Sequence, residues 1–438
     1  MATAASANIL PPLDETGPLA GALRFGAIAS VMGGLAFNLF LCFVNTRIMP
    51  MRDSHVMLME MAIIGTALIV AMDRRAGLYL FLGIFISYML MLFTLRGASD
   101  LKAVRDILIP VIFYAMGSRL RDLKLADNLA VWSAIVVLFF AFFEYFLLDL
   151  YLEWFNVLGY YISKGTVTLT ESYGATKGLF ISGSRPEPRT ILSFLGQHRV
   201  SSVFLEPVSM GNFGVIIFSW AMFRRGWSGR WFLFAAALAM VVLADARFGL
   251  FTCILIVLLA PFFKVIPRTF WLVTPFLLLA LIAAYGFATG TNGGPNDLSG
   301  RIAVTAHILT ELSLPVVLGV EATAQFTADS GLAYTLTKFG LFGFIALWAT
   351  FIFMPFRNAR AWDFHSMMIV YLLLIMVISN SFFSIKTGAL MWFMAGTVSA
   401  VDIPAVKSIW SRLMERTQSR AGQAVPSADR SRRAGSRA

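Results

Sequence analysis

The chain has 438 residues, of which 58% are hydrophobic and 13% are charged. Its apolar residues come in repeated blocks of about 17 to 23, the length needed to cross roughly 30 Å of hydrocarbon. The blocks show no alternation of apolar and polar residues, which excludes a transmembrane β-barrel. The net charge of +11 does not indicate nucleic-acid binding, because Lys and Arg lie in short loops between blocks and in the C-terminal tail. The sequence therefore predicts an all-α polytopic membrane protein in a lipid bilayer.

The N-terminal segment, residues 1–22, begins without Lys or Arg and has no cleavable apolar core, so we predict a short tail and not a signal peptide. About twelve transmembrane helices are predicted within residues 23–402. The fourth is short and contains Pro110, which is compatible with a tilted or partly re-entrant segment. The predicted spans are 23–44, 56–72, 77–95, 106–118, 128–148, 204–223, 231–246, 248–263, 270–288, 331–355, 366–384 and 387–402.

The loops between these spans form two alternating sets. One set is rich in Lys and Arg, as at Arg74 and Arg75 or Arg224 and Arg225, and the positive-inside rule places it in the cytoplasm. An even number of spans then puts both termini in the cytoplasm. Residues 403–438 are small, polar and basic, so we predict a disordered tail that anchors the topology or touches anionic lipid.

Two long connections, about 149–203 and 289–330, fall on the outer, periplasmic side. The first opens with YLEWFNVLGYYISKG, an aromatic amphipathic stretch suited to the membrane interface. The second contains RIAVTAHILTEL, which is predicted to form a periplasmic helix. The chain has no Walker-type or dinucleotide glycine motif, so we expect it to work on the outer face without a nucleotide of its own.

Metal-ligand spacing is absent from the sequence. The histidines have no partner at helical spacing and no nearby cysteine, and both cysteines fall within predicted spans. We therefore predict no metal site and no other cofactor. The residues concerned are His55, His198, His307, His365, Cys42 and Cys253.

The stretch QHRVSSVFLEPVSMGNFG places charged residues at the start of the sixth span. Arg199 and Glu206 are seven positions apart and would share a helix face if the helix extended back through SSVF. A structural ion pair or a helix-end anchor is the alternative interpretation. Pro207 fits the first turn of a helix, which would fix the direction of the Glu206 carboxylate.

Three further outward residues are candidates for a site. Arg247 lies in the tight turn LADARFGL and breaks the positive-inside pattern. Arg301 stands at the head of the predicted periplasmic helix, and Asp329 directly precedes the tenth span. Asp329 with Ser330 could instead serve as a helix N-cap.

Arginine forks bind phosphate in a bidentate manner and stay charged when desolvated, and a carboxylate can act as general base on a hydroxyl. Several outward arginines near the bilayer surface, together with two or three carboxylates, therefore indicate a lipid-linked phosphate or diphosphate substrate. Further cations predicted on the outer side are Arg47, Arg52, Arg96, Lys102, Arg105, Arg185, Arg189 and Lys386.

Four short motifs in this order resemble bacterial exopolysaccharide polymerases of the O-antigen polymerase and ligase superfamily, most closely the xanthan-type repeat-unit polymerases. They are R-x-S-S-x-F-x-E-P-x-x-x-G (Arg199 to Gly211), the A-R-F-G turn, S-G-R (Ser299 to Arg301), and the segment from Asp329 to Gly343, which begins D-S and ends G-x-x-G. The resemblance covers roughly residues 190–400.

This resemblance implies a GT-C-like fold and a metal-independent, inverting glycosyltransferase in the bacterial inner membrane. Its substrates would be undecaprenyl-diphosphate-linked oligosaccharides, and its partners a flippase and chain-length or export proteins. Arg199, Arg247 and Arg301 would hold the diphosphate. The ligase branch has a histidine where this chain has Asp329, which favours a polymerase.

The catalytic base is predicted to be Glu206, with Asp329 second and His198 third. A ligase that moves finished glycan to another acceptor would share the arginines. A flippase or other transporter of lipid-linked sugars is the alternative from a different class. A transporter should carry paired ionisable residues near the bilayer midplane, and Glu144 is the main candidate inside a span.

Overall fold

A computed structural model describes residues 17–73, 76–167, 178–184, 189–289, 298–323, 327 and 330–402. Within these residues the chain forms helices and no strand, with one isolated β-bridge between Ser184 and His198. The predicted all-α class is therefore confirmed. The predicted C-terminal tail, 403–438, and most of the predicted N-terminal tail lie outside the described residues.

Each of the predicted spans coincides with a helix, although the bounds differ by several residues. These helices are α1 (Pro18–Arg47), α2 (Asp53–Ala71), α3 (Ala76–Arg96), α4 (Leu101–Leu120), α5 (Leu123–Phe146), α8 (Pro207–Phe223), α9 (Arg230–Leu243), α10 (Arg247–Leu259), α11 (Arg268–Thr289), α14 (Gly331–Phe353), α15 (Ala361–Ile378) and α16 (Ile385–Ala400).

The two long connections also contain helices. They hold α6 (Leu148–Trp154), α7 (Val157–Ser163), α12 (Leu298–Glu311) and α13 (Leu314–Leu318). One of these helices, α12, covers most of the segment RIAVTAHILTEL that was predicted to be helical. Short 3-10 helices complete the fold at η1 (Ile181–Gly183), η2 (Ser193–Leu195), η3 (Ser202–Phe204), η4 (Ala260–Phe262) and η5 (Ser381–Phe383).

Seven helices of the described chain are long and apolar enough to cross a membrane, namely α1, α2, α3, α5, α11, α14 and α15. Three shorter helices, α8, α9 and α10, are also apolar. The membrane character of the protein is thus supported, whereas twelve crossings and a GT-C-like architecture stay predictions. Helix α4 runs without interruption through Pro110 over 20 residues, which makes it longer than its sequence pattern indicated.

Glycines allow α4 and α16 to pack with their backbones in contact. A Cβ atom on Gly117 would lie 2.1 Å from the carbonyl oxygen of Phe393, and one on Gly396 would lie 2.0 Å from that of Tyr114. Small residues at helix interfaces are typical of membrane bundles, where close packing replaces the hydrophobic effect as the driving force. Any larger residue at Gly117 or Gly396 would therefore separate these two helices.

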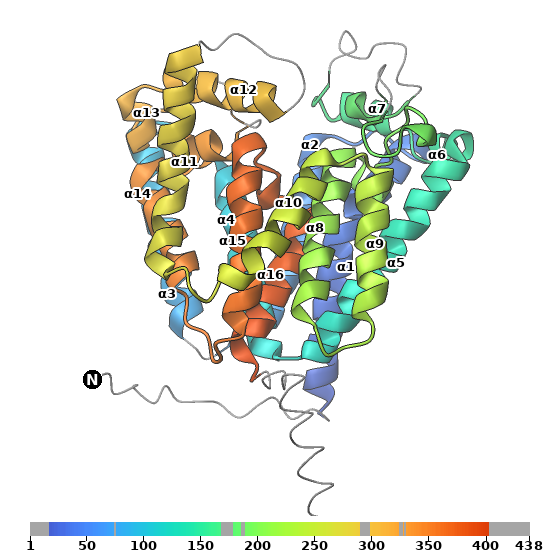
Figure 1. The fold of residues 1–438 in the computed structure, drawn as a ribbon, viewed down its shortest axis with the longest axis horizontal. Coiled ribbons are helices and arrows are strands. Elements are labelled where there is room, and N and C mark those ends of the chain that lie inside the picture. Colours follow the sequence, from blue (N-terminus) through green and yellow to red (C-terminus); the bar gives the residue numbers. More distant parts are fainter. Residues whose placement is uncertain are drawn as a thin grey trace, which may run out of the picture. The chain divides into compact units, whose positions relative to one another are not determined.

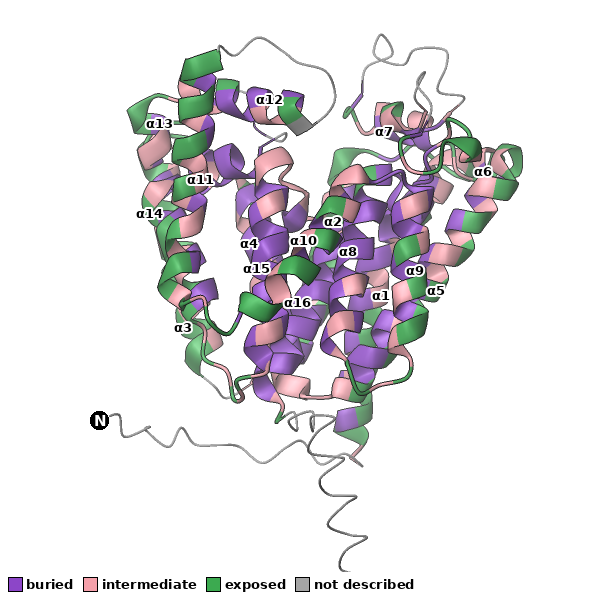
Figure 2. Cartoon of the chain, in the orientation of Figure 1, coloured by how far each residue is buried: buried purple, intermediate pink, exposed green. Residues whose placement is uncertain are grey.

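The helices stand roughly side by side, and the short helices gather at one end of the bundle (Figure 1). We call this end the α7 end, because it carries α6, α7, α12 and α13. The α4–α5 and α8–α9 connections lie at the opposite end (Figure 1). Helices α8, α15 and α16 form the buried centre, whereas α3 and α11 expose long green stretches at the periphery (Figure 2). The peripheral helices therefore present the apolar surface that lipid would cover.

The start of α8 differs from the predicted start of the sixth span. The helix does not extend back through SSVF, because Ser202–Phe204 forms η3 and Leu205 adopts a left-handed conformation with φ of 62°. Glu206 is the N-cap residue of α8, and Pro207 occupies the first turn as predicted. Arg199 and Glu206 consequently do not share a helix face, and that prediction was wrong.

Candidate functional site

Glu206 lies at the α7 end, where three side chains contact its carboxylate. Oε1 accepts a hydrogen bond of 2.6 Å from the Tyr161 hydroxyl of α7, and Oε2 accepts one of 2.9 Å from the Ser209 hydroxyl of α8. The Lys386 ammonium, at the start of α16, is 3.4 Å from Oε2. The Glu206 side chain remains 29% exposed, so a ligand could reach it.

A second lysine belongs to the same neighbourhood. Lys164 follows α7, and the charges of Lys386, Glu206, Asp53 and Glu60 all act on it. Burial, reinforced by the charge of Lys386, lowers the pKa of the Lys164 ammonium. We call Tyr161, Lys164, Glu206, Ser209 and Lys386 the Glu206 cluster.

The electrostatics of the cluster keep Glu206 ionised. Burial alone would raise the pKa of Glu206, but Lys386 and the hydrogen bonds from Tyr161 and Ser209 outweigh it, so the pKa lies below its ordinary value of 4.5. Burial and the nearby Glu206 charge raise the pKa of the Tyr161 phenol well above its usual range. Tyr161 therefore stays protonated and donates to the carboxylate.

His198 lies in a different environment, although it is only eight residues from Glu206. Its Nε2 is 3.0 Å from Oε1 of Glu144, which is fully buried near the end of α5. The backbone N–H groups of Ser201 and Ser202 also donate to the Glu144 carboxylate. We call Glu144, His198, Ser201 and Ser202 the Glu144 cluster, and its contacts fasten the loop before α8 onto α5.

The guanidinium of Arg199 is buried and faces backbone carbonyls. Nε donates to Ala244 at 3.0 Å, Nη1 donates to Ser182 at 3.1 Å, and Nη2 lies 3.4 Å from the carbonyl of Asp245. Ala244 and Asp245 form the turn between α9 and α10. In this structure Arg199 therefore holds that turn in place.

Arg247 begins α10 directly after that turn and is half-buried. Its Nε is buried, and within the described part of the chain it has no hydrogen-bond partner. A Cβ atom on Gly211 would lie 2.2 Å from the Cβ of Ala246, so the glycine that ends the R-to-G motif permits α8 and α10 to touch. This contact brings Arg247 beside the first turns of α8, the helix that Glu206 caps.

The other two predicted residues, Arg301 and Asp329, belong to the second long connection. Arg301 lies in the first turn of α12, which packs mainly against α11, α14 and α15. Asp329 lies outside the described residues. Ser330 caps α14 by accepting a hydrogen bond of 3.2 Å from the backbone N–H of Ala333, as the N-cap interpretation predicted.

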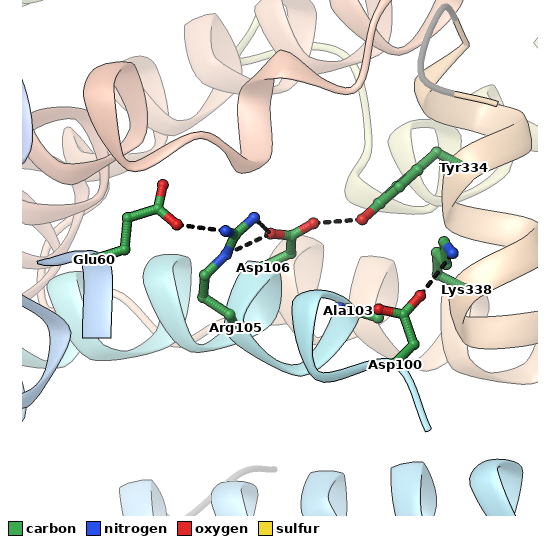
Figure 3. A network of polar contacts seen from close by, with 7 residues as sticks. All are labelled: Glu60, Asp100, Ala103, Arg105, Asp106, Tyr334 and Lys338. Atoms are coloured by element: carbon green, nitrogen blue, oxygen red, sulfur yellow. Dashed lines mark hydrogen bonds and ion pairs between the residues drawn. The ribbon is translucent and has the colours of Figure 1, made fainter. Parts of the chain in front are cut away.

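A buried chain of charges that the sequence patterns did not predict links helices α2, α4 and α14. Arg105 on α4 pairs with Glu60 on α2 and, at 2.6 Å, with its neighbour Asp106. The Tyr334 hydroxyl of α14 donates to Oδ2 of Asp106 at 2.5 Å (Figure 3). One signal was present in the sequence, since a lone carboxylate in the apolar run MLMEMAII is costly unless it is paired.

Beside this chain of charges, α14 is interrupted at Gly340, where its backbone passes close to that of Leu318 and Arg96 donates hydrogen bonds. Gly340 has φ of 67°, and a Cβ atom there would lie 2.6 Å from the carbonyl oxygen of Leu318. Arg96 donates to the carbonyls of Gly319 and Lys338 at 2.7 and 3.0 Å. Gly340 of the Asp329-to-Gly343 motif is thus required by a close backbone approach.

Among the described residues, no group of three or more His, Cys, Asp or Glu side chains is arranged to hold a metal ion. Comparison with protein-family models, with curated proteins and with solved structures finds no match. The assignment of function therefore depends on the geometry of the site and on the motif resemblance.

Proposed function

We propose that the protein is a membrane glycosyltransferase that polymerises undecaprenyl-diphosphate-linked oligosaccharide repeat units on the outer face of the bacterial inner membrane. The observation that carries this proposal is the Glu206 cluster. It combines an ionised, partly exposed carboxylate with two lysines and a protonated phenol at the end of an apolar helix bundle. Such a set suits a lipid-linked anionic substrate and a hydroxyl acceptor.

In this proposal Glu206 accepts the proton of an acceptor sugar hydroxyl. The hydroxyl oxygen forms a bond to the anomeric carbon of the donor glycan, and the bond from that carbon to the diphosphate oxygen breaks. Undecaprenyl diphosphate leaves with the electron pair, and the configuration at the anomeric carbon inverts. Lys164, Lys386 and Arg247 stabilise the charge that develops on the diphosphate.

Binding of the diphosphate would also prepare the base. Lys386 contributes most to the low pKa of Glu206. An anionic ligand that pairs with the Lys386 ammonium weakens this contribution, so the effect of burial dominates and the pKa of Glu206 rises. Glu206 then becomes a stronger base in the loaded enzyme than in the free one. A base whose pKa approaches the working pH transfers protons most effectively.

The remaining predicted residues take different roles in this proposal. Arg199 and His198 are positioning residues, because their contacts fix the α9–α10 turn and the loop before α8. Arg301 is a second diphosphate contact, and Asp329 is the alternative base. Both termini are cytoplasmic, and the flippase and the chain-length or export proteins of the same pathway are the partners.

Elongation by the reconstituted protein tests this function. The purified protein in lipid nanodiscs receives a lipid-linked repeat unit, without nucleotide and with a metal chelator, and the products are separated on a gel. We expect longer lipid-linked glycans from the wild type and a loss of about 10²–10⁴-fold in rate for Glu206→Gln, the usual contribution of a general base.

Glu153→Gln is the matched control, because Glu153 is an exposed carboxylate that pairs with Arg47. It should elongate at the wild-type rate. No elongation by the wild type would contradict the polymerase, and normal elongation by Glu206→Gln would remove Glu206 as the base. Transfer only to an acceptor other than a repeat unit would identify the ligase.

A transporter of lipid-linked sugars is the second candidate, and the buried chain of Glu60, Arg105, Asp106 and Tyr334 favours it. Paired ionisable residues inside apolar helices are typical of transport pathways. Liposomes that contain the protein and a fluorescent lipid-linked sugar distinguish the two. Flipping by the wild type that Arg105→Gln abolishes, together with no elongation, would establish the transporter.

A further inference from the structure

A cavity of about 930 Å³ lies between α3, α4, α14, α15 and α16, away from the site described above. None of the residues of the Glu206 cluster lines it. Its walls are largely apolar and aromatic, as at Phe81, Val111, Phe344, Trp348 and Trp392. A cavity of this volume and lining is in the range that buries a substantial apolar ligand.

The rim of the cavity at the end opposite α7 is basic. Arg119, Arg121 and Arg357 line it, against a single carboxylate at Asp73. Nη1 of Arg119 donates to the carbonyl of Val70 at 2.8 Å, which leaves the other nitrogens of that guanidinium for a ligand. The surplus of fixed positive charge indicates an anionic group at the mouth of the cavity.

Arg121 supplies a second and independent indication of a ligand. It ends α4 in a left-handed conformation with φ of 52°, and its Nε is buried without a hydrogen-bond partner among the described residues. Buried donors are normally paired, so this one leaves room for an acceptor oxygen of a bound molecule.

The cavity is longer than one leaflet of a bilayer is thick. At 1.5 Å per residue its lining on α4, from Ile107 to Arg119, is about 18 Å, and its lining on α14, from Thr335 to Phe353, is about 27 Å. Half of a hydrocarbon core is roughly 15 Å. The cavity reaches Phe382 and Phe383 directly before α16, so the space accommodates acyl chains that begin at the basic rim and extend toward the α7 end.

We propose that this cavity binds an anionic diacyl phospholipid. Its phosphate is held by Arg121 together with Arg119 and Arg357, and its acyl chains lie among the apolar side chains of α4, α14 and α16. The phosphate site is at the end opposite the Glu206 cluster and does not depend on the glycosyltransferase proposal. The role of the bound lipid is to fill the space between α4 and α14 with its acyl chains.

The lipid that co-purifies with the protein tests the site. The protein is exchanged into detergent with equal amounts of phosphatidylglycerol and phosphatidylethanolamine, and bound lipid is measured by mass spectrometry. We expect phosphatidylglycerol to be retained preferentially, and Arg121→Gln to reduce its retention by at least about tenfold, the effect of losing one charged hydrogen bond. Lys124→Gln is the control, because Lys124 is exposed nearby and does not line the cavity.

The contribution of the acyl chains is tested separately. Ala115→Trp fills the cavity from α4 and should remove the bound phosphatidylglycerol, whereas glycerol phosphate, which carries the headgroup without chains, should not displace it. Gel filtration and the melting temperature verify that each variant is folded. Equal retention of the two lipids, equal loss in Arg121→Gln and Lys124→Gln, retention by folded Ala115→Trp, or displacement by glycerol phosphate would overturn the proposal.

Discussion

The Glu144 carboxylate contacts the loop before α8 and Glu206 ends that loop, yet the surroundings of these two carboxylates differ in one decisive way. Glu144 is fully buried, and two of its three donors are backbone N–H groups, which cannot move without unfolding the loop. Glu206 is partly exposed, and its partners are side chains, which can exchange it for a ligand. A carboxylate held by the backbone stabilises the fold, whereas one held by side chains is available for chemistry.

Two arginines beside the α9–α10 turn, Arg199 and Arg247, show the same difference. Arg199 donates hydrogen bonds to carbonyls of the turn and of Ser182. Arg247, three residues beyond Ala244, keeps a buried Nε without a partner in the described chain. One arginine fixes the turn and the other is positioned by it, and the Nε of Arg247 is a donor available to an anion.

The largest effect on this comparison is expected from Glu144→Ala. It removes the acceptor of His198 and of two backbone N–H groups, so we expect a loss of about 3–5 kcal/mol in the free energy of unfolding. Thermal unfolding in a fixed detergent measures this loss, with Glu153→Ala as an exposed control. A melting temperature close to that of the wild type would show that Glu144 does not anchor the loop.

A smaller effect is expected from Arg199→Lys. The lysine ammonium keeps the charge but cannot donate to the carbonyls of Ala244 and Ser182 at the same time, as the guanidinium does. We therefore expect a loss of about 1–3 kcal/mol in the free energy of unfolding. Elongation per folded molecule should not change, with Arg47→Lys as an exposed control. Unchanged stability with slower elongation would instead place Arg199 on the diphosphate, as the motif resemblance implied.

The smallest effect is a shift in pH dependence for Lys386→Gln. Lys386 lowers the pKa of Glu206 in the free enzyme, so its removal lets burial raise that pKa, and the acid limb of the kcat/KM profile for elongation should move to higher pH. In the wild type, the stability linked to the lowered pKa is present above 4.5 and is lost as the pH falls through the folded-state pKa.

Lys102→Gln is the control for this shift, because Lys102 is an exposed lysine at the same end of the bundle. Its elongation profile should coincide with that of the wild type. An acid limb that stays in place in Lys386→Gln would show that the titrating base is a group other than Glu206.

The helices were largely predictable, because a block of apolar residues long enough to cross a bilayer has few other stable conformations. The pairing of the buried charges could not be predicted from the sequence. Asp106 and Tyr334 are 228 residues apart, and nothing in either local pattern shows that they meet. The motif resemblance implied a diphosphate contact for Arg199, but a motif gives spacing and not the identity of the oxygens that a guanidinium reaches.

The left-handed break at Gly340 divides α14 into two stretches with largely different contacts. The stretch before it carries Tyr334 and Lys338, which are tied to Asp106 and Asp100 at the α7 end. The stretch after it carries Phe344 and Leu347, which face the cavity. Since the helical hydrogen-bond ladder is interrupted between them, bending stiffness is lowest at this point. A displacement of one stretch is therefore taken up by bending at Gly340 and is not transmitted along the whole helix.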